Sequence, residues 1–114
     1  MQTVHDLPVF QRSYDLYKEL YLAVKQFPKG DRYALGESCK TNALELVTAV
    51  IQAASTRNEW KVAAIDKGLG ATELLKVFIR MAHDTECLRE PRYVALQQRL
   101  QEIGRMLGGW KRSV

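Results

Sequence analysis

The chain has 114 residues and a mass of 13.0 kDa, which is the size of a single domain (residues 1–114) with one hydrophobic core. Hydrophobic residues make up 46% and charged residues 26%, close to globular averages, which excludes disordered, collagen-like and low-complexity classes. No run of about 18 apolar residues occurs, and residues 1–30 show no signal-peptide pattern. We therefore expect a cytoplasmic protein without a membrane segment.

The net charge of +4 is concentrated at the C-terminal end of the chain. Residues 1–88 hold 11 basic and 11 acidic residues, whereas residues 89–114 hold six basic residues and two acidic ones. A basic segment of this kind indicates either an anionic partner such as nucleic acid or a solvated helix face. The charge distribution alone leaves both interpretations open.

Residues 8–27 form the first predicted helix, with Pro8 at a position where its missing N–H costs nothing. One stripe at helical spacing contains Val9, Ser13, Leu16, Tyr17, Leu20, Val24 and Phe27. A second, aromatic line lies beside it and contains Phe10, Tyr14, Tyr17 and Tyr21. We expect this line either to contact another subunit or to form the edge of the core, with base stacking as a further alternative.

The segment 27–31 ends the first helix, and Asp31 is the predicted N-cap of a second helix. The apolar positions of this second helix are Leu35, Cys39, Ala43, Leu46, Val47, Val50, Ile51 and Ala54. After a predicted turn at residues 55–58, a third helix is expected over residues 59–88. Its apolar face contains Ala71, Leu74, Leu75, Phe78, Ile79 and Ala82.

The segment 89–91 contains Pro91 and separates the third helix from the fourth. The fourth helix has the strongest periodic signal, with apolar residues at spacings of 3, 4, 3, 4 and 3: Tyr93, Leu96, Leu100, Ile103, Leu107 and Trp110. Short connections make neighbouring helices antiparallel. The sequence therefore predicts an all-α fold, an up-down-up-down four-helix bundle.

Glycines occur at two places within the predicted helices. Gly68 and Gly70 match part of a dinucleotide-binding loop, but the third glycine and the preceding strand are missing. Close helix packing or a local kink is the favoured interpretation. Gly104 and Gly108, one turn apart, also suit a close helix contact, and Gly109 is a predicted left-handed helix terminator.

No catalytic or cofactor motif is recognisable in the chain. His5, His83, Cys39 and Cys87 show no metal-ligand spacing, and no Glu-x-x-His pair occurs. Both cysteines lie in predicted helices, which favours reduced structural thiols over a disulfide. We therefore expect no metal, no cofactor and no enzymatic activity.

Lys76 and Arg80 lie one turn apart on the polar face of the third helix, with Glu73 and Asp84 nearby. This arrangement is typical of a salt-bridged solvated helix, and it also suits a pair that contacts phosphate. The candidate nucleic-acid-binding residues are this pair and the basic residues of the last helix: Lys76, Arg80, Arg92, Arg99, Arg105, Lys111 and Arg112.

Several segments along nearly the whole chain carry a family resemblance: residues 7–10, 27–28, 31–36 and, most specifically, 102–110. The sequence resembles four-helix-bundle proteins first noticed as open reading frames in intervening sequences of bacterial 23S ribosomal RNA genes. It is most similar to the branch that contains the accessory variability determinant of diversity-generating retroelements. Lys76-Val77-Phe78-Ile79-Arg80 matches a basic pattern of that branch, and Arg105 lies inside the shared C-terminal motif.

The resemblance implies homopentameric barrels that bind nucleic acid and a partner reverse transcriptase. The predicted function is therefore that of a non-enzymatic, oligomeric accessory protein that binds template RNA or cDNA. The alternative is a structural oligomeric adaptor that binds another protein through the aromatic line or through the ends of the bundle. Salt-dependent binding to RNA or DNA distinguishes the two hypotheses.

Overall fold

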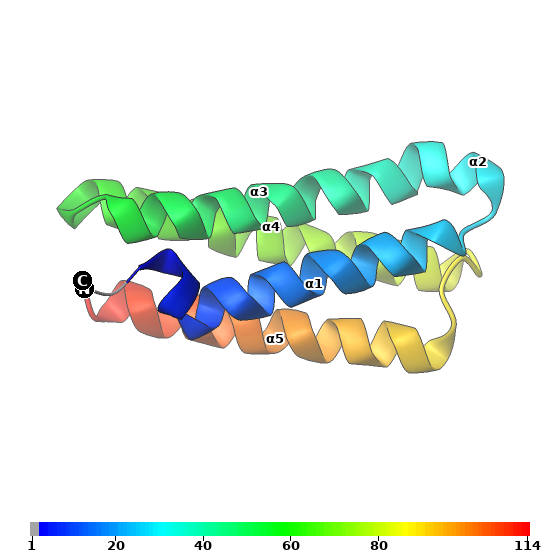
Figure 1. Ribbon diagram of the computed structural model, residues 1–114. Helices are drawn as coiled ribbons and strands as arrows, with labels where there is room; N and C mark the ends of the chain where they lie inside the picture. Colours follow the sequence, from blue (N-terminus) through cyan, green and yellow to red (C-terminus); the bar gives the residue numbers. More distant parts are fainter. Residues whose placement is uncertain (1–2) are drawn as a thin grey trace.

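A computed structural model describes residues 3–114, and every regular element in that range is helical (Figure 1). Four long helices form the bundle: α1 (Pro8–Lys25), α3 (Glu37–Ser55), α4 (Asn58–Asp84) and α5 (Glu90–Arg112). Three short elements accompany them: η1 (Val4–Asp6), α2 (Lys29–Asp31) and η2 (Arg32–Gly36). The predicted all-α four-helix bundle is confirmed.

The four long helices alternate in direction, and η1 and the C-terminus lie at the same end of the bundle (Figure 1). The bundle is 43 Å long and 22 Å wide. α3 packs against α1 and α4, and α5 packs against the same two helices from the other side. α1 and α4 therefore occupy diagonal corners, as do α3 and α5.

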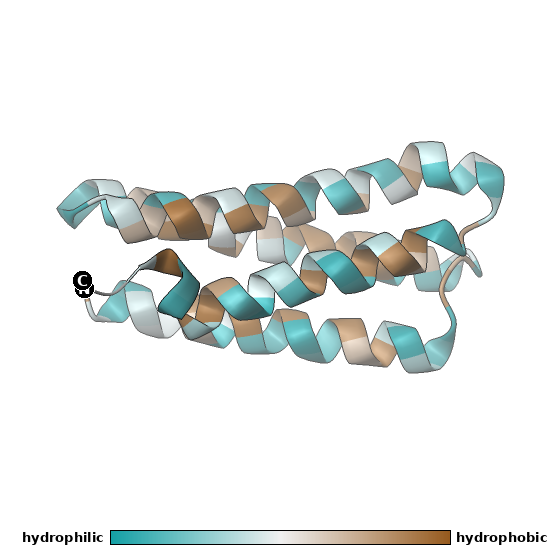
Figure 2. Ribbon diagram, in the orientation of Figure 1, coloured by the Kyte–Doolittle hydropathy of each residue, from teal (hydrophilic) through white to brown (hydrophobic). Residues whose placement is uncertain are grey.

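The core follows the predicted helical stripes closely. Hydrophobic residues recur along all four long helices in Figure 2. In α5, the four central positions of the heptad pattern, Leu96, Leu100, Ile103 and Leu107, are completely buried. Ser13 lies in the apolar stripe of α1 and is also buried, and its hydroxyl donates a hydrogen bond of 2.8 Å to the carbonyl of Val9. This bond satisfies the buried hydroxyl within its own helix.

The second predicted helix begins differently from the prediction. Asp31 is not its N-cap, because Lys29 is already helical and Asp31 itself has helical dihedral angles (φ −75°, ψ −23°). A wide π-type turn over Arg32–Gly36 then joins α2 to α3. Gly36 lets this turn pack against α1, since a Cβ there would lie 2.6 Å from Cγ1 of Val24.

The structure corrects further details of the sequence prediction. Leu74 and Ile51, both predicted on core faces, are each 43% exposed. α4 ends at Asp84 rather than at residue 88, and the connection after it contains Glu86 in the left-handed region (φ 64°). Gly109 does not end the last helix, which continues to Arg112. These corrections leave the order and number of the long helices unchanged.

The glycines inside the helices have different roles. The close packing expected at Gly68 is confirmed, because a Cβ there would lie 3.3 Å from Leu107 of α5 and 3.6 Å from Ala49 of α3. The same interpretation is wrong for Gly70, which is exposed and where an added Cβ would meet no side chain or neighbouring helix within 4 Å. It is also wrong for Gly108, which faces the side chain of Arg112 in its own helix.

Candidate nucleic-acid interface

Four of the seven predicted nucleic-acid-binding residues form ion pairs with carboxylates. On α4, Lys76 Nζ lies 3.1 Å from Glu73 Oε1, and Arg80 Nε lies 3.8 Å from Asp84 Oδ2. These pairs are local and exposed, so each contributes at most about 1 kcal/mol to stability. Their cations remain accessible, but part of their charge is already balanced by the neighbouring carboxylates.

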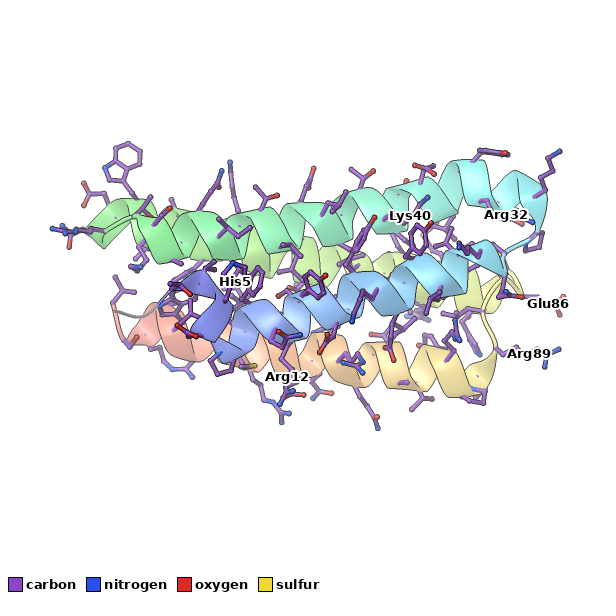
Figure 3. All side chains as sticks on the ribbon, in the orientation of Figure 1. His5, Arg12, Arg32, Lys40, Glu86 and Arg89 are labelled. Atoms are coloured by element: carbon purple, nitrogen blue, oxygen red, sulfur yellow. The ribbon has the colours of Figure 1, made fainter. Side chains whose placement is uncertain are left out.

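The other two pairs connect helices. Arg99 Nε of α5 lies 2.6 Å from Glu19 Oε2 of α1, and Lys111 Nζ of α5 lies 2.8 Å from Asp66 Oδ1 of α4. A further pair between α1 and α5 joins Arg12, labelled in Figure 3, to a carboxylate of α5 at 3.0 Å. Arg99 and Lys111 therefore lie on the flanks of α5, where they hold that helix against its neighbours.

Arg92, Arg105 and Arg112 form no ion pair with any residue between Thr3 and Val114. Arg105 and Arg112 are seven residues apart, so they lie on one face of α5, and both are exposed. The guanidinium nitrogens of Arg112 lie 3.5 and 3.8 Å from the Cβ positions that side chains at Gly108 and Gly109 would occupy. These two glycines therefore leave room for the Arg112 side chain against the helix. We call Arg105 and Arg112 the α5 arginine pair.

The seven predicted residues do not form one continuous patch. Arg92 and Arg99 are also seven residues apart, but they lie on the side of α5 that contacts α1. Arg92 lines a cavity of about 600 Å³ at the end of the bundle, next to Arg89. Arg89 and Arg32, both labelled in Figure 3, lie at this same end and were not among the predicted residues. The signal for Arg89 was present in the basic C-terminal segment.

The aromatic line of α1 is only partly exposed. Phe10 is 7% exposed and packs in the core, which agrees with the core-edge alternative for this residue. Tyr14 and Tyr21 are 48% and 41% exposed, whereas Tyr17 is half-buried against the core. The outward aromatic surface therefore comes from the tyrosines. A cavity of about 320 Å³ is lined by two of them and by two further residues of α1: Tyr17, Lys18, Tyr21 and Leu22.

Lysine ammonium groups lie over the rings of Tyr14 and Tyr21. Lys18 Nζ lies 5.3 Å from the ring centroid of Tyr14, and Lys25 Nζ lies 4.8 Å from that of Tyr21. Lys40 of α3, labelled in Figure 3, lies 5.9 Å from the Tyr21 centroid. These distances fit cation–π contacts, which orient the rings along the boundary between α1 and α3. We call Tyr14, Tyr17, Tyr21 and Leu22 the α1 tyrosine surface.

Sequence reasoning missed a second apolar surface, on α4. Leu74, Val77 and Met81 are 43%, 54% and 47% exposed, and their spacings of 3 and 4 place them on one face. Gly70 continues this row by one turn, beside a groove of about 460 Å³ between α3 and α4. The 4-3-4 spacing was the available signal, but Leu74 was assigned to the core. We call Gly70, Leu74, Val77 and Met81 the α4 stripe.

Two cysteines and a histidine at the end of the bundle where α4 meets α5 are buried or take part in contacts between helices. Burial raises the pKa of the Cys39 thiol from 9.0 to about 11, and the nearby Cys87 adds to this effect. Both cysteines are free and buried in the structure. His83 stacks on Tyr93 with ring centroids 4.2 Å apart, and its Nε2 lies 2.5 Å from Glu90 Oε2. His83 thus joins the end of α4 to the start of α5.

Two kinds of feature are absent from residues 3–114. These residues contain no group of three or more His, Cys, Asp or Glu side chains placed to hold a metal ion. None of the helices in this range combines the length and hydropathy that a membrane-spanning segment needs.

The fold and surfaces define a four-helix bundle whose main outer features are basic and apolar faces. A family model described as bAvd-like matches residues 8–114, which is nearly the whole chain. The chain therefore belongs to the bAvd-like family, which is of the accessory, non-catalytic type. This match confirms the resemblance drawn from the sequence. A search of curated proteins finds no match.

Proposed function

We propose that this protein is a non-enzymatic accessory protein that binds nucleic acid as a homo-oligomer and works together with a reverse transcriptase. Membership of the bAvd-like family supports the accessory role. The family resemblance of the sequence supports a pentamer, with template RNA or cDNA as the bound nucleic acid. The observation that carries the proposal is the α5 arginine pair, because these two exposed cations have no carboxylate partner among residues 3–114.

The α5 arginine pair is suited to contact phosphates. Arg105 and Arg112 project from the same face of one helix, two turns apart, so both can reach one backbone. Arginine offers several donors in a planar arrangement that matches phosphate geometry. A cation without a carboxylate partner gains more from a phosphate than one that must first give up an ion pair, as Lys76 or Arg80 must.

Assembly strengthens this interaction. The chain carries a net charge of only +4, and residues 1–88 are electrically balanced, so the net positive charge of one protomer is small. In a symmetric oligomer the α5 arginine pair is repeated on every copy, and one strand can contact several copies. Because each contact releases counterions, affinity is expected to fall steeply as salt concentration rises.

The test is a titration of fluorescently labelled single-stranded RNA, followed by anisotropy at several salt concentrations. We expect Arg105→Glu/Arg112→Glu to weaken binding by at least tenfold. Loss of two phosphate contacts should also reduce the slope of log K against log salt by about 1.4, because each contact on a single strand contributes about 0.7. The matched control is Lys76→Glu/Arg80→Glu, which makes the same change in charge at ion-paired positions.

The control also tests the role that the sequence predicts for Lys76 and Arg80. A larger loss for Lys76→Glu/Arg80→Glu than for the α5 pair would place the interface on α4 instead. Equal losses for both variants would show that net charge alone governs binding. Unchanged binding in the Arg105→Glu/Arg112→Glu variant would contradict the proposed site.

A second candidate function is supported by the exposed Tyr14 and Tyr21 of α1. Exposed tyrosines with half-buried rings are common at protein interfaces, which favours an adaptor that binds another protein. Absence of RNA and DNA binding by the wild-type protein at low salt would favour this adaptor. Binding of the purified reverse transcriptase encoded beside the gene, where one exists, would test the partner directly.

A further inference from the structure

Two exposed apolar surfaces of the bundle contain several residues each: the α1 tyrosine surface and the α4 stripe. Further exposed apolar side chains lie outside them, at Tyr33, Leu44, Ile51 and Trp60. We propose that these two surfaces contact each other between neighbouring copies of the chain, so that each copy uses one surface of each kind. This inference rests on the assembly part of the proposed function and assigns the faces that form the contact. Nucleic-acid binding is a separate property, and it is measured separately.

The α4 stripe has the pattern of a helix-packing seam. Single exposed apolar residues are ordinary on protein surfaces. Here, however, Gly70, Leu74, Val77 and Met81 recur at spacings of 4, 3 and 4 on the face of α4 opposite to the buried Thr72. This is the spacing that lets one helix pack along another. A continuous row of this length on a soluble protein indicates an interaction surface.

The two surfaces are complementary in shape. The α1 tyrosine surface contains a hollow of about 320 Å³, whose lining includes the rings of Tyr17 and Tyr21. Branched and flexible side chains such as Leu74 and Met81 are of a size to enter it, and a methionine sulfur makes favourable contacts with aromatic rings. The lining of the groove beside Gly70 includes the small side chains of Ala49 and Ala71, which leave space for a protruding ring.

Charge around the two surfaces is also complementary. Lys25 lies beside the ring of Tyr21 and has no ion pair with residues 3–114. Glu45 and Lys67 line the groove next to the α4 stripe, and neither has an ion pair within that part of the chain, so Glu45 is the residue of this groove that can pair with a lysine. A lysine on one copy and a glutamate on the next therefore find partners across the contact. Such pairs favour one orientation and disfavour contact of a surface with its own copy.

The positions of the surfaces determine the type of assembly. Because the two surfaces differ, the contact is head-to-tail, and repeated head-to-tail contacts produce a ring or an open filament. Both surfaces lie toward α3: Tyr21 is contacted by Lys40 of α3, and the groove of the α4 stripe lies between α3 and α4. The two surfaces therefore lie on adjacent sides of the bundle, so each contact rotates one copy relative to the next, as a ring requires.

The available area is sufficient for a stable contact. One side of a bundle 43 Å long and 22 Å wide offers an area of the order of the roughly 800 Å² per partner that specific interfaces bury. The outer face of α5 is diagonal to α3 and takes no part in this contact. The α5 arginine pair thus stays accessible in the assembled protein.

The test uses two variants of the full chain and their mixture, measured by light scattering after gel filtration without nucleic acid. Leu74→Glu/Met81→Glu disables the α4 stripe, and Tyr14→Glu/Tyr21→Glu disables the α1 tyrosine surface. We expect each variant alone to be a monomer. In an equimolar mixture, one intact contact remains possible, so we expect a species with the mass of two chains. Val94→Glu/Gln101→Glu on exposed positions of α5 adds the same charge and should keep the wild-type mass.

Several outcomes overturn the inference. A monomeric wild-type protein refutes the contact, and a variant that keeps the wild-type mass shows that its surface is not used. A mixture that stays monomeric shows that the two surfaces do not contact each other. If a glutamate variant loses its helical circular dichroism, Leu74→Ala/Met81→Ala replaces it, with an expected tenfold or greater rise in the dissociation constant of the assembly. A protein that assembles without binding RNA retains this inference and refutes only the nucleic-acid role.

Discussion

Gly36 connects the π-type turn to α1, and its environment allows a stability prediction with a definite sign. The substitution Gly36→Ala gains about 1 kcal/mol of helix propensity. Its new Cβ, however, would lie 2.6 Å from Cγ1 of Val24 and 3.2 Å from the carbonyl oxygen of Asp31. Overpacking of this kind costs about 1 to 3 kcal/mol, so we expect a net loss of about 1 kcal/mol.

A second substitution relieves the clash. Val24→Ala removes two buried methyl groups and costs about 2 kcal/mol, including the cavity that it leaves. In Val24→Ala/Gly36→Ala the new methyl group fills part of that cavity, and the propensity gain remains. We therefore expect the double variant to be about 1 kcal/mol less stable than the wild type, whereas the sum of the single variants is about 3 kcal/mol. The expected coupling is about 2 kcal/mol.

Urea unfolding followed by circular dichroism measures all four proteins of this cycle. The control cycle pairs Val24→Ala with Gly30→Ala, because a Cβ at Gly30 meets no atom within 4 Å. We expect this control to be additive. Additivity within about 0.5 kcal/mol for Gly36 as well would refute the packing of Gly36 against Val24. A changed m-value in one variant would indicate a changed unfolded or native ensemble instead.

Two further predictions concern the core. Because burial raises the pKa of Cys39 from 9.0 to about 11, the thiol ionises at lower pH in the unfolded chain than in the folded one. The shift contributes about 2 to 3 kcal/mol to the free energy of unfolding, fully below pH 9.0, and this contribution is lost as the pH rises toward 11. The urea midpoint should therefore decline over this pH range, and Cys39→Ala should abolish that decline. Leu100→Ala should cost about 2 to 5 kcal/mol, because Leu100 is completely buried, whereas Gln101→Ala on the exposed neighbour should change stability by less than about 0.5 kcal/mol. A decline with pH that persists in Cys39→Ala would contradict the burial of the Cys39 thiol. A small effect of Leu100→Ala would contradict the burial of Leu100.

The sequence predicts the bundle well where the relevant information is local. In α5, Leu96, Leu100 and Ile103 alternate with polar residues, so a single face can be apolar and its burial follows from the helical period. Pro8, Pro28 and Pro91 mark helix starts or breaks because proline cannot donate a backbone hydrogen bond. These local effects suffice to give four helices and their order.

Prediction fails where several faces of one helix are apolar. Between Leu74 and Met81, α4 carries apolar residues around much of its circumference, so periodicity does not select the buried face. The structure selects the face that contains Gly68, because the absence of a side chain there lets α3 and α5 approach closely. The buried face of α4 thus combines Gly68 with large residues such as Leu75 and Ile79. Leu74 is exposed as a result.

Contacts between residues that are far apart in the chain also cannot be predicted from a single sequence. Arg99 and Glu19 are separated by 80 positions, and their ion pair depends on the axial register of α5 against α1. Nothing in the spacing of either helix specifies that register. For this reason, the sequence locates the basic segment but does not distinguish the roles of its arginines. Arg99 holds two helices together, whereas Arg105 is unpaired within residues 3–114.

The arrangement of surfaces follows from the number of helices. In a four-helix bundle each helix has one outer face, and a helix contacts two neighbours but not the one diagonal to it. The α1 tyrosine surface and the α4 stripe lie on the two helices that have α3 as a common neighbour, whereas the α5 arginine pair lies on the helix diagonal to α3. Substitutions that change assembly and substitutions that change nucleic-acid binding therefore fall on different helices. If the two proposals are correct, a monomeric Leu74→Glu/Met81→Glu variant keeps its arginine pair but loses the repetition of that pair, so its RNA affinity falls without loss of any direct contact.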